Sequence, residues 1–518
     1  MRPSTSLTAR GAASVCAAVF TFGFCSLAEA QTAAPCESLT TTLALAHATV
    51  TLAASVEANG FTRPSAVPGA PGLSNPVPFC RVVVTSKPST DSDITIEAWL
   101  PASGWNGKFL AVGNGGWAGT INYGLLNDGL MRGYAAAGTD TGHVGASGAF
   151  AYGHPEKLID YAYRSEHELA VIGKAIVAGY YGATPRLSLW NGCSAGGRQG
   201  ITEAWRYPED FDAIIAGAPG NYQMRMHVAR VALNVFAHRS ADSYVPPEKY
   251  PLIHNAILSA CDELDGLKDG LISDPPACRF DARVLACTSV DASSCLNAAQ
   301  VESVNAMFAP VKHPKTGEVI TNALVQPGSE LGWAILAGPQ PLNIAQDGLK
   351  YIAFNYPAWN WRHFNPAIDI DRALTASGSW DVTSADLRPF FNRGGKLLMY
   401  HGWADPQVTP LNSVTYFNDV LQTTGAASQG KSIELFMSPG MNHCRGGVGF
   451  DTFDVIGAME QWIATGRAPA QIPASHLTNG VVDRTRPLCP YPQLATYTGS
   501  GSIDEAANFR CDKPAATH

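Results

Sequence analysis

The sequence has few charged residues and no excess of basic ones. Asp, Glu, Lys and Arg make up 15% of its 518 residues, below the roughly 25% typical of globular chains, and the formal net charge is −8. Sequence-independent binding of nucleic acid or anionic lipid needs a surface rich in Lys and Arg, so we expect no nucleic-acid partner. After residue 30, no run reaches the roughly 18 apolar residues of a membrane span, and no repeat of solenoid period occurs. The 46% hydrophobic content is nevertheless ample for a large core, and the length predicts about two to four structural units.

The first thirty residues have the pattern of a secretory signal. Two arginines precede an apolar stretch over residues 11–27, and the small-residue site Ala28-Glu29-Ala30 follows it. A lipoprotein anchor at Cys25 is an alternative, but it usually needs a small residue where Phe24 stands. We therefore expect residues 1–30 to be removed and the protein to be secreted or periplasmic, with no membrane contact afterwards.

Two of the 12 cysteines lie in the predicted signal, which leaves ten in the mature chain. An even number of cysteines in an exported chain predicts up to five disulfide bonds, formed in an oxidising compartment. The number alone does not fix which cysteines pair.

Short apolar runs that alternate with helical patterns predict the α/β class. We expect a helix over 161–181 and strands at 94–100, 108–112, 133–138, 187–190, 213–216, 396–400 and 433–436. This alternation implies a doubly wound parallel sheet covered on both faces. It lapses between about residues 221 and 387, so we expect an inserted domain there and a main domain made of residues 31–220 and 388–518.

The strand near residue 190 runs into Gly192-Cys193-Ser194-Ala195-Gly196, a Gly-x-Ser-x-Gly pattern. Glycines on both sides of a serine permit the sharp strand-to-helix turn that lifts its hydroxyl out of a sheet. An ordinary tight turn is the alternative, because the pattern also recurs by chance in glycine-rich chains. The preceding strand and the following helix favour Ser194 as a nucleophile, and the backbone N–H of Ala195 is the expected donor to its oxyanion.

A serine hydroxyl needs a base to take its proton and an acid to orient that base. In doubly wound hydrolases the acid and then the histidine follow the serine along the chain. Asp405 and His443 each follow a predicted strand in this order. The alternatives are that Asp405 caps a turn and that His443 is a structural or metal-binding residue. His401 is a rival base, but it lies so near Asp405 in sequence that we expect a structural role for it.

Two cysteines flank the predicted nucleophile and base. Cys193 immediately precedes Ser194, and Cys444 immediately follows His443. If the serine and histidine lie within hydrogen-bond reach, these cysteines fall within the Cα separation of roughly 4.4–6.8 Å that a disulfide requires. We therefore expect a Cys193–Cys444 bond between the two segments; the alternative is that each cysteine pairs elsewhere.

These segments resemble the tannase and feruloyl esterase family. The resemblance extends from about Cys36 to Cys511, and its most specific parts are Gly192-Cys-Ser-Ala-Gly-Gly197, His401-Gly-Trp-Ala-Asp405 and Pro439-Gly-Met-Asn-His-Cys444. It implies an α/β-hydrolase sheet with Ser194 as nucleophile, His443 as general base and then acid, and Asp405 as the residue that orients His443.

The resemblance also assigns residues that the local pattern leaves open. It points to Gly116, in the glycine turn at 113–116, as the second oxyanion donor; a plain glycine turn is the alternative. It implies a structural calcium ion held by the carboxylates of Asp262, Asp265 and Asp269 and the carbonyls of Leu267 and Leu271. Composition alone would favour an acidic solvated turn there. It pairs the remaining cysteines as Cys36–Cys80, Cys261–Cys278, Cys287–Cys295 and Cys489–Cys511.

Ser194 and Asp405 are 211 residues apart, more than two or three strand-helix units would fill, so we interpret residues 221–387 as a lid domain. Its aromatic side chains are a candidate wall for an aromatic acyl group, and a small hydrophobic core is the alternative. These residues are Trp333, Phe354, Tyr356, Trp359, Trp361 and Phe364.

Together these features predict a secreted serine carboxylesterase that acts through an acyl-enzyme and uses no organic cofactor. We expect small esters of aromatic acids such as ferulate or gallate, including esters attached to a plant polysaccharide or polyphenol. A mono(hydroxyethyl) terephthalate-type hydrolase, also found in this family, is the alternative. Its substrate would favour an arginine that binds the free carboxylate, and the lid has none between Arg283 and Arg362. A noncatalytic secreted binding protein is a remote alternative, because the serine, aspartate and histidine are all present.

Overall fold

The computed structural model describes residues 33–63, 73–289, 292–378, 381 and 384–514, and Ala33–His518 form one compact unit. The predicted signal and the alternative anchor at Cys25 lie outside the described residues. Within the described ranges, no helix combines the length and the apolar content that crossing a membrane requires.

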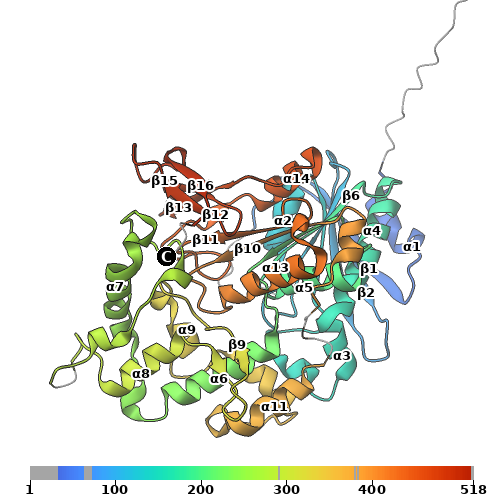
Figure 1. Ribbon diagram of the computed structural model, residues 1–518. Helices are drawn as coiled ribbons and strands as arrows, with labels where there is room; N and C mark the ends of the chain where they lie inside the picture. The colour runs from blue at the N-terminus through green and yellow to red at the C-terminus, as the bar shows by residue number, and fades with distance from the viewer. Residues whose placement is uncertain (1–32, 64–72, 290–291, 379–380, 382–383, 515–518) are drawn as a thin grey trace, which may run out of the picture. The chain divides into compact units, whose positions relative to one another are not determined.

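A nine-stranded sheet forms the centre of this unit, in the order β1-β2-β3-β5-β4-β6-β7-β10-β11 (Figure 1). The six strands from β5 to β11 in this order run parallel, which agrees with the predicted doubly wound sheet. The nine strands are β1 (Ala48–Val56), β2 (Phe79–Ser86), β3 (Ile94–Pro101), β4 (Lys108–Val112), β5 (Ala135–Thr139), β6 (Leu187–Cys193), β7 (Ala213–Gly217), β10 (Lys396–Gly402) and β11 (Ile433–Ser438).

The prediction of a parallel sheet is wrong for β3, the strand predicted at 94–100, and the sheet continues beyond it with two further antiparallel strands. β3 pairs with β5 in the antiparallel sense, and β2 and β1 continue that sense outward. Residues 87–93 alone connect β2 to β3, whereas a parallel crossover needs a dozen or more residues. β1 and β2 themselves were not predicted from the sequence.

Helices cover both faces of the sheet because successive side chains on a strand point to opposite sides. On β4, Phe109 and Ala111 join an apolar cluster with α4, α5 and α13, while Leu110 and Val112 join another with α2 and α14. The predicted helix at 161–181 begins as a π-helical turn, η3 (Asp160–Arg164), and continues as α4. The helices of this part are α1 (Leu39–Thr42), α2 (Tyr123–Met131), α3 (Pro155–Ile159), α4 (Ser165–Tyr181), α5 (Ala195–Arg206), α12 (Arg388–Asn392), α13 (Pro410–Thr424) and α14 (Val455–Thr465).

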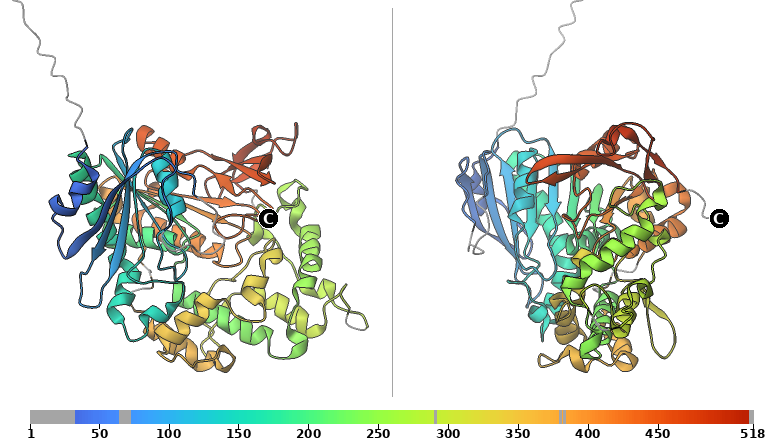
Figure 2. Two further views of the ribbon diagram at one scale, coloured as in Figure 1. Left: turned by 180° about the vertical axis from the view of Figure 1, so that it is seen from behind. Right: turned by 90° about the vertical axis from the view of Figure 1, so that its left-hand side faces the viewer.

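Residues 221–387, which we call the lid segment, are mainly helical and gather on one side of the sheet, coloured green to orange in Figure 2. The segment belongs to the same compact unit as the sheet, so its status as a separate domain stays a prediction. Its elements are α6 (Gln223–Ala237), α7 (Tyr250–Cys261), α8 (Ala298–Met307), β8 (Val311–Lys312), β9 (Val319–Thr321), α9 (Ala334–Ala337), α10 (Asn343–Asp347) and α11 (Pro366–Ala376).

Most of the lid aromatic residues form apolar cores. Trp333 is buried in one cluster, and Phe354, Trp361 and Phe364 are buried in another. Trp359 packs against the second cluster, whereas Tyr356 is exposed. The core interpretation therefore accounts for these four buried side chains better than the candidate substrate wall does.

The last part of the chain adds two small antiparallel sheets, red in Figure 1. One contains β12 (Thr452–Phe453), β13 (Ile472–Thr478) and β14 (Val481–Leu488), and the other contains β15 (Leu494–Tyr497) and β16 (Phe509–Asp512). β14 carries Arg486, a buried guanidinium that reaches the predicted calcium segment.

Candidate active site

Ser194 sits on a strained turn between β6 and α5. Its backbone has φ 65° and ψ −122°, a conformation that non-glycine residues rarely adopt and that clusters at functional sites. Two hydrogen bonds hold it: Ser194 N–H donates to Gly217 O (2.9 Å), and Gly220 N–H donates to Ser194 O (3.0 Å). This is the sharp turn that the Gly-x-Ser-x-Gly pattern predicts.

Glycines are required around this turn because backbone segments meet there. A Cβ on Gly192 would lie 2.5 Å from Gly196 O, and a Cβ on Gly197 would lie 2.4 Å from Gly217 O. Both distances are shorter than any ordinary contact, so a side chain at Gly192 would push β6 and α5 apart, and one at Gly197 would push α5 away from β7.

Asp405 and His443 meet as predicted from their order. His443 Nδ1 lies 2.6 Å from Asp405 Oδ2, so the ring carries its proton there and leaves Nε2 for another partner. Asp405 Oδ1 accepts the backbone N–H groups of Gln407 (2.7 Å) and Val408 (2.9 Å). Burial alone would raise the pKa of Asp405, but the charges and hydrogen bonds of His443 and His401 outweigh it and lower the pKa below its usual value. Asp405 is therefore ionised, and both of its carboxylate oxygens are engaged, which suits the predicted role of orienting His443.

His401 contacts Asp405 from within the core. Its Nε2 lies 3.0 Å from Asp405 Oδ2, and its Nδ1 lies 2.7 Å from Ser413 Oγ. The side chain is fully buried. Because both ring nitrogens are engaged away from solvent, this geometry favours the expected structural role over that of a rival base.

The Cys193–Cys444 disulfide is formed, with Cα atoms 6.1 Å apart. It joins the residue before Ser194 to the residue after His443, and so keeps the Cα atoms of the serine and the histidine within about 14 Å. The described side chains of Ser194 and His443 do not share a hydrogen bond; in unliganded sites such bonds are often long and tighten when substrate binds. The other four disulfides match the expected pairs, Cys36–Cys80, Cys261–Cys278, Cys287–Cys295 and Cys489–Cys511.

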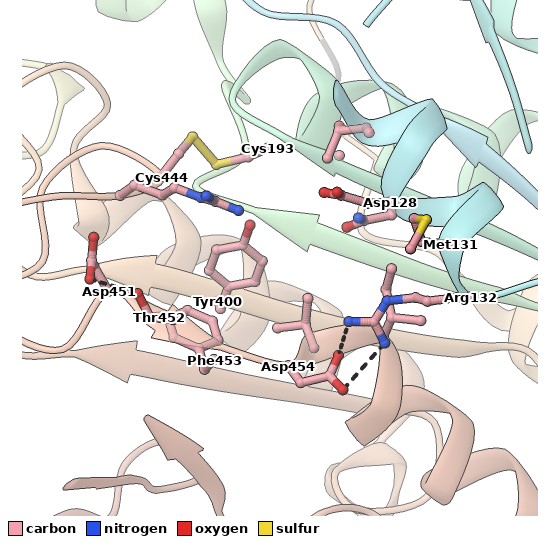
Figure 3. A pocket seen from close by; sticks show the side chains of 16 residues that line it. Asp128, Met131, Arg132, Cys193, Tyr400, Cys444, Asp451, Thr452, Phe453 and Asp454 are labelled. Carbon is pink, nitrogen blue, oxygen red and sulfur yellow. Dashed lines mark hydrogen bonds and ion pairs between the residues drawn. A yellow bond between two sulfur atoms is a disulfide. The ribbon is translucent and has the colours of Figure 1, made fainter. Parts of the chain in front are cut away.

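A pocket of about 550 Å³ adjoins this disulfide (Figure 3). Cys193 and Cys444 form part of its wall together with Tyr400, and the Arg132–Asp454 ion pair borders it. Ser194 and His443 are not among the residues that line it, so we do not assign this pocket to the ester substrate.

The two predicted oxyanion donors lie on segments that contact each other. Ala195 is the first residue of α5, where a backbone N–H has no partner within the helix. Gly116 follows β4 with φ 54°, a left-handed conformation that suits glycine. Gly196 N–H donates to Asn114 O (2.8 Å), which ties the loop of Gly116 to the start of α5.

The sequence pattern of the tannase and feruloyl esterase family matches residues 80–512. The chain belongs to this family. It is 35% identical to an uncharacterized esterase of Xanthomonas campestris pv. campestris, covering 94% of this chain and 93% of that protein. It is 33% identical to a probable feruloyl esterase B-2 of Aspergillus terreus, covering 86% of this chain and 88% of the relative. The crystal structure of feruloyl esterase B from Aspergillus oryzae matches with a TM-score of 0.86 at 30% identity, covering 92% of this chain and 99% of that chain.

Membership of the tannase and feruloyl esterase family confirms the predicted α/β-hydrolase fold and makes this chain a carboxylic ester hydrolase. The alternative of a noncatalytic binding protein is therefore set aside. The roles of individual residues, by contrast, stay predictions that rest on the geometry described above.

In this esterase the predicted calcium segment is held by hydrogen bonds within itself and to Arg486. Asp262 accepts the backbone N–H groups of Asp269 and Gly270, while Asp269 Oδ2 accepts Arg486 Nη2 (2.8 Å). Burial raises the pKa of Asp265, an effect that a bound cation would reverse. The oxygen donors suit calcium. In the described part of the chain, however, no group of three or more His, Cys, Asp or Glu side chains is arranged to hold a metal ion. Calcium at Asp262, Asp265, Leu267, Asp269 and Leu271 stays a prediction.

Sequence reasoning missed several polar residues that support the site of this esterase. Gln199 on α5 and Tyr161 on η3 both contact the loop of Gly116, and Arg230 on α6 donates to Gln407 O beside Asp405. All three supporting residues are buried. Tyr161 begins a predicted helix and Gln199 lies in the helix expected after Ser194, but which partner each residue contacts depends on the folded arrangement.

Proposed function

We propose that this esterase is a secreted serine carboxylesterase that hydrolyses esters of aromatic, phenolic acids through an acyl-enzyme. One observation carries the proposal: His443 Nδ1 lies 2.6 Å from Asp405 Oδ2, while Cys444, the next residue, is bonded to Cys193 beside Ser194. This arrangement points His443 Nε2 away from its orienting acid and keeps the histidine near the strained serine.

In the first half-reaction, Ser194 Oγ attacks the ester carbonyl carbon and passes its proton to His443 Nε2. The buried, ionised Asp405 stabilises the imidazolium that forms. The backbone N–H groups of Ala195 and Gly116 donate to the oxyanion of the tetrahedral intermediate. His443 then gives its proton to the leaving alcohol oxygen, and the acyl group remains on Ser194.

In the second half-reaction, a water molecule takes the place of the alcohol. His443 Nε2 accepts a proton from the water as its oxygen attacks the acyl carbon, and returns the proton to Ser194 Oγ as the acid leaves. The products are one carboxylic acid and one alcohol, and no cofactor takes part in either step.

The proposed acyl group is that of a phenolic acid such as ferulate or gallate. The names of the relatives as feruloyl esterases support the first, and the family description supports both. The alcohol half includes small alcohols and sugar hydroxyls of a plant polysaccharide. A mono(hydroxyethyl) terephthalate-type activity is the rival to be measured beside them.

Initial rates on methyl ferulate, methyl gallate and mono(hydroxyethyl) terephthalate test the substrate class. We expect the phenolic esters to be hydrolysed with the higher kcat/KM. A higher kcat/KM for the terephthalate monoester would instead favour the mono(hydroxyethyl) terephthalate-type activity. Ser194→Ala is expected to abolish turnover without unfolding the protein. Ser188→Ala, on the same strand, is the matched control and should retain activity. Wild-type turnover by Ser194→Ala would exclude the serine mechanism.

Structural calcium and secretion complete the proposal. Removal of calcium by a chelator is expected to lower Tm, and Asp265→Asn should make Tm insensitive to the chelator. The absence of both calcium in elemental analysis and a Tm shift would contradict the site. N-terminal sequencing of exported protein should find a chain that begins at Gln31, and an unprocessed Met1 would contradict the predicted signal.

A further inference from the structure

Helix α5 carries more than the predicted nucleophile. Ser194 is its N-cap residue, and Arg198 and Gln199 follow one turn later with fully buried side chains. Gln199 contacts the loop of Gly116 directly, and Arg198 contacts Tyr161, which bonds to that loop. One rigid helix therefore connects the serine to the segment that supplies the second proposed oxyanion donor.

Gln199 binds Asn114, two residues before Gly116, at two points. Gln199 Oε1 accepts Asn114 N–H (3.0 Å), and Gln199 Nε2 donates to Asn114 Oδ1 (3.2 Å). Asn114 Nδ2 in turn donates to the carbonyl oxygens of Thr120 (2.9 Å) and Thr139 (2.8 Å), which holds the loop against β5. A buried amide paired at both ends leaves the start of the loop little freedom.

Tyr161 fixes the peptide group after Gly116. Its hydroxyl donates to Gly116 O at 2.8 Å. Arg198 contacts Tyr161 in two ways. Its Nη2 donates to Tyr161 O (3.2 Å), and its guanidinium lies 5.1 Å from the centre of the tyrosine ring. This second connection also starts on α5.

The peptide group before Gly116 is fixed within the loop. Ala118 N–H donates to Gly115 O (2.9 Å). Because a trans peptide is planar, the Gly116 N–H points opposite to that carbonyl. Both peptide groups that flank Gly116 are therefore held, and the direction of its N–H follows from contacts that do not involve the substrate.

We propose that Tyr161 and Gln199 are positioning residues, which hold the Gly116 N–H at a set place relative to Ser194 and the Ala195 N–H. Neither side chain touches the reacting atoms; each acts through the loop. The inference rests on the proposed serine esterase function. It extends that function by naming what fixes the oxyanion site before substrate arrives.

The test compares Tyr161→Phe and Gln199→Met with the wild-type enzyme on methyl ferulate. Tyr181→Phe is the matched control, because it removes a hydroxyl bonded to a backbone carbonyl (Pro101 O, 2.8 Å). Loss of a whole oxyanion donor costs about 10²–10³ in kcat, so a misplaced donor should cost about tenfold or more. We expect that fall in kcat with KM within about twofold, while Tyr181→Phe keeps the wild-type kcat.

A second readout separates positioning from general damage. A phenylboronic acid bonds to the serine oxygen as a tetrahedral adduct and engages the oxyanion donors, whereas ferulic acid binds as a planar product. In Tyr161→Phe the boronic acid should bind more weakly by the factor lost in kcat, with ferulic acid affinity unchanged. Wild-type kcat in Tyr161→Phe, or a lower kcat with unchanged boronic acid affinity, would overturn the inference. If Gln199→Met does not fold, the tyrosine variant decides alone. Failure of the proposed function is distinct, since the wild-type enzyme would then not hydrolyse the ester.

Discussion

Asp405→Asn gives the sharpest prediction, because every acceptor position of the carboxylate is used. An ionised carboxylate offers about four lone pairs, and Asp405 receives N–H groups from His443, His401, Gln407 and Val408. An asparagine can satisfy only two of these donors. If its oxygen keeps the two backbone N–H groups, its NH₂ faces the imidazoles. If it is flipped, the NH₂ faces the two backbone N–H groups instead.

The first orientation has a specific chemical consequence. An NH₂ opposite His443 Nδ1 forces that nitrogen to accept, so the ring proton moves to Nε2. His443 can then no longer take the proton of Ser194. We expect kcat to fall by about 10⁴-fold, or about 5.4 kcal/mol, which is the scale for a base held in the wrong tautomer.

His401→Phe is the comparison variant. It removes one of the four donors to Asp405 and leaves the tautomer of His443 unchanged. The loss of one hydrogen bond to a charged group is about 1.5–3 kcal/mol, so kcat should fall by about 10–10²-fold. The kcat values of the two variants are thus expected to differ by about 10²–10³-fold.

The assay is steady-state hydrolysis of methyl ferulate, with far-UV circular dichroism and Tm for each variant. Asp405→Asn should fold, since the shape of the side chain is kept. An Asp405→Asn enzyme that folds and retains kcat within about tenfold of wild type would refute the assignment of Asp405 as the orienter. A larger loss in His401→Phe than in Asp405→Asn would instead identify His401 as the base.

Two further predictions concern the disulfide and a buried carboxyl. Cys193→Ser/Cys444→Ser opens a link across 251 residues, worth up to about 5.5 kcal/mol on the entropic model, so Tm and kcat should both fall. Cys287→Ser/Cys295→Ser opens a link across 8 residues and should leave kcat unchanged. If both double variants lost kcat equally, the Cys193–Cys444 disulfide would have no specific role in holding Ser194 near His443. Burial raises the pKa of Glu434 from 4.5 to about 7. The folded state therefore holds a proton that the unfolded chain releases, and stability falls as pH rises through that window. Glu434→Gln should raise the unfolding free energy by up to about 3 kcal/mol at pH 8 and change it little at pH 4, measured by denaturant titration.

The candidate site was predictable because its residues follow strands in the parallel part of the sheet. Ser194, Asp405 and His443 come after β6, β10 and β11, and the carboxyl ends of parallel strands meet at one edge. The adjacent cysteines then fixed one distance between two segments that are far apart in the chain. Local patterns were enough for both steps, since each depends only on strand order and on neighbours in sequence.

What stayed hidden depends on contacts between distant segments. The antiparallel strands β1 and β2 were missed, and a local pattern does not say which strand each of them pairs with. Tyr161 lies at the start of the predicted helix at 161–181 and Gln199 in the helix after Ser194, and only the folded chain brings them to Gly116 and Asn114. Whether a buried polar residue finds a functional partner is a tertiary property, so periodicity cannot reveal it.

The strained turn at Ser194 shows how such tertiary contacts act on the chemistry. Holding a non-glycine residue in this conformation costs roughly 1–3 kcal/mol. The backbone bonds to Gly217 and Gly220 offset this cost, since each contributes about 1 kcal/mol. They form only because Gly197, which has no Cβ, lets α5 approach the end of β7. Relaxing the serine would break both bonds, so the backbone conformation of Ser194 is fixed by the end of β7 and the turn after it rather than by the serine's own preference.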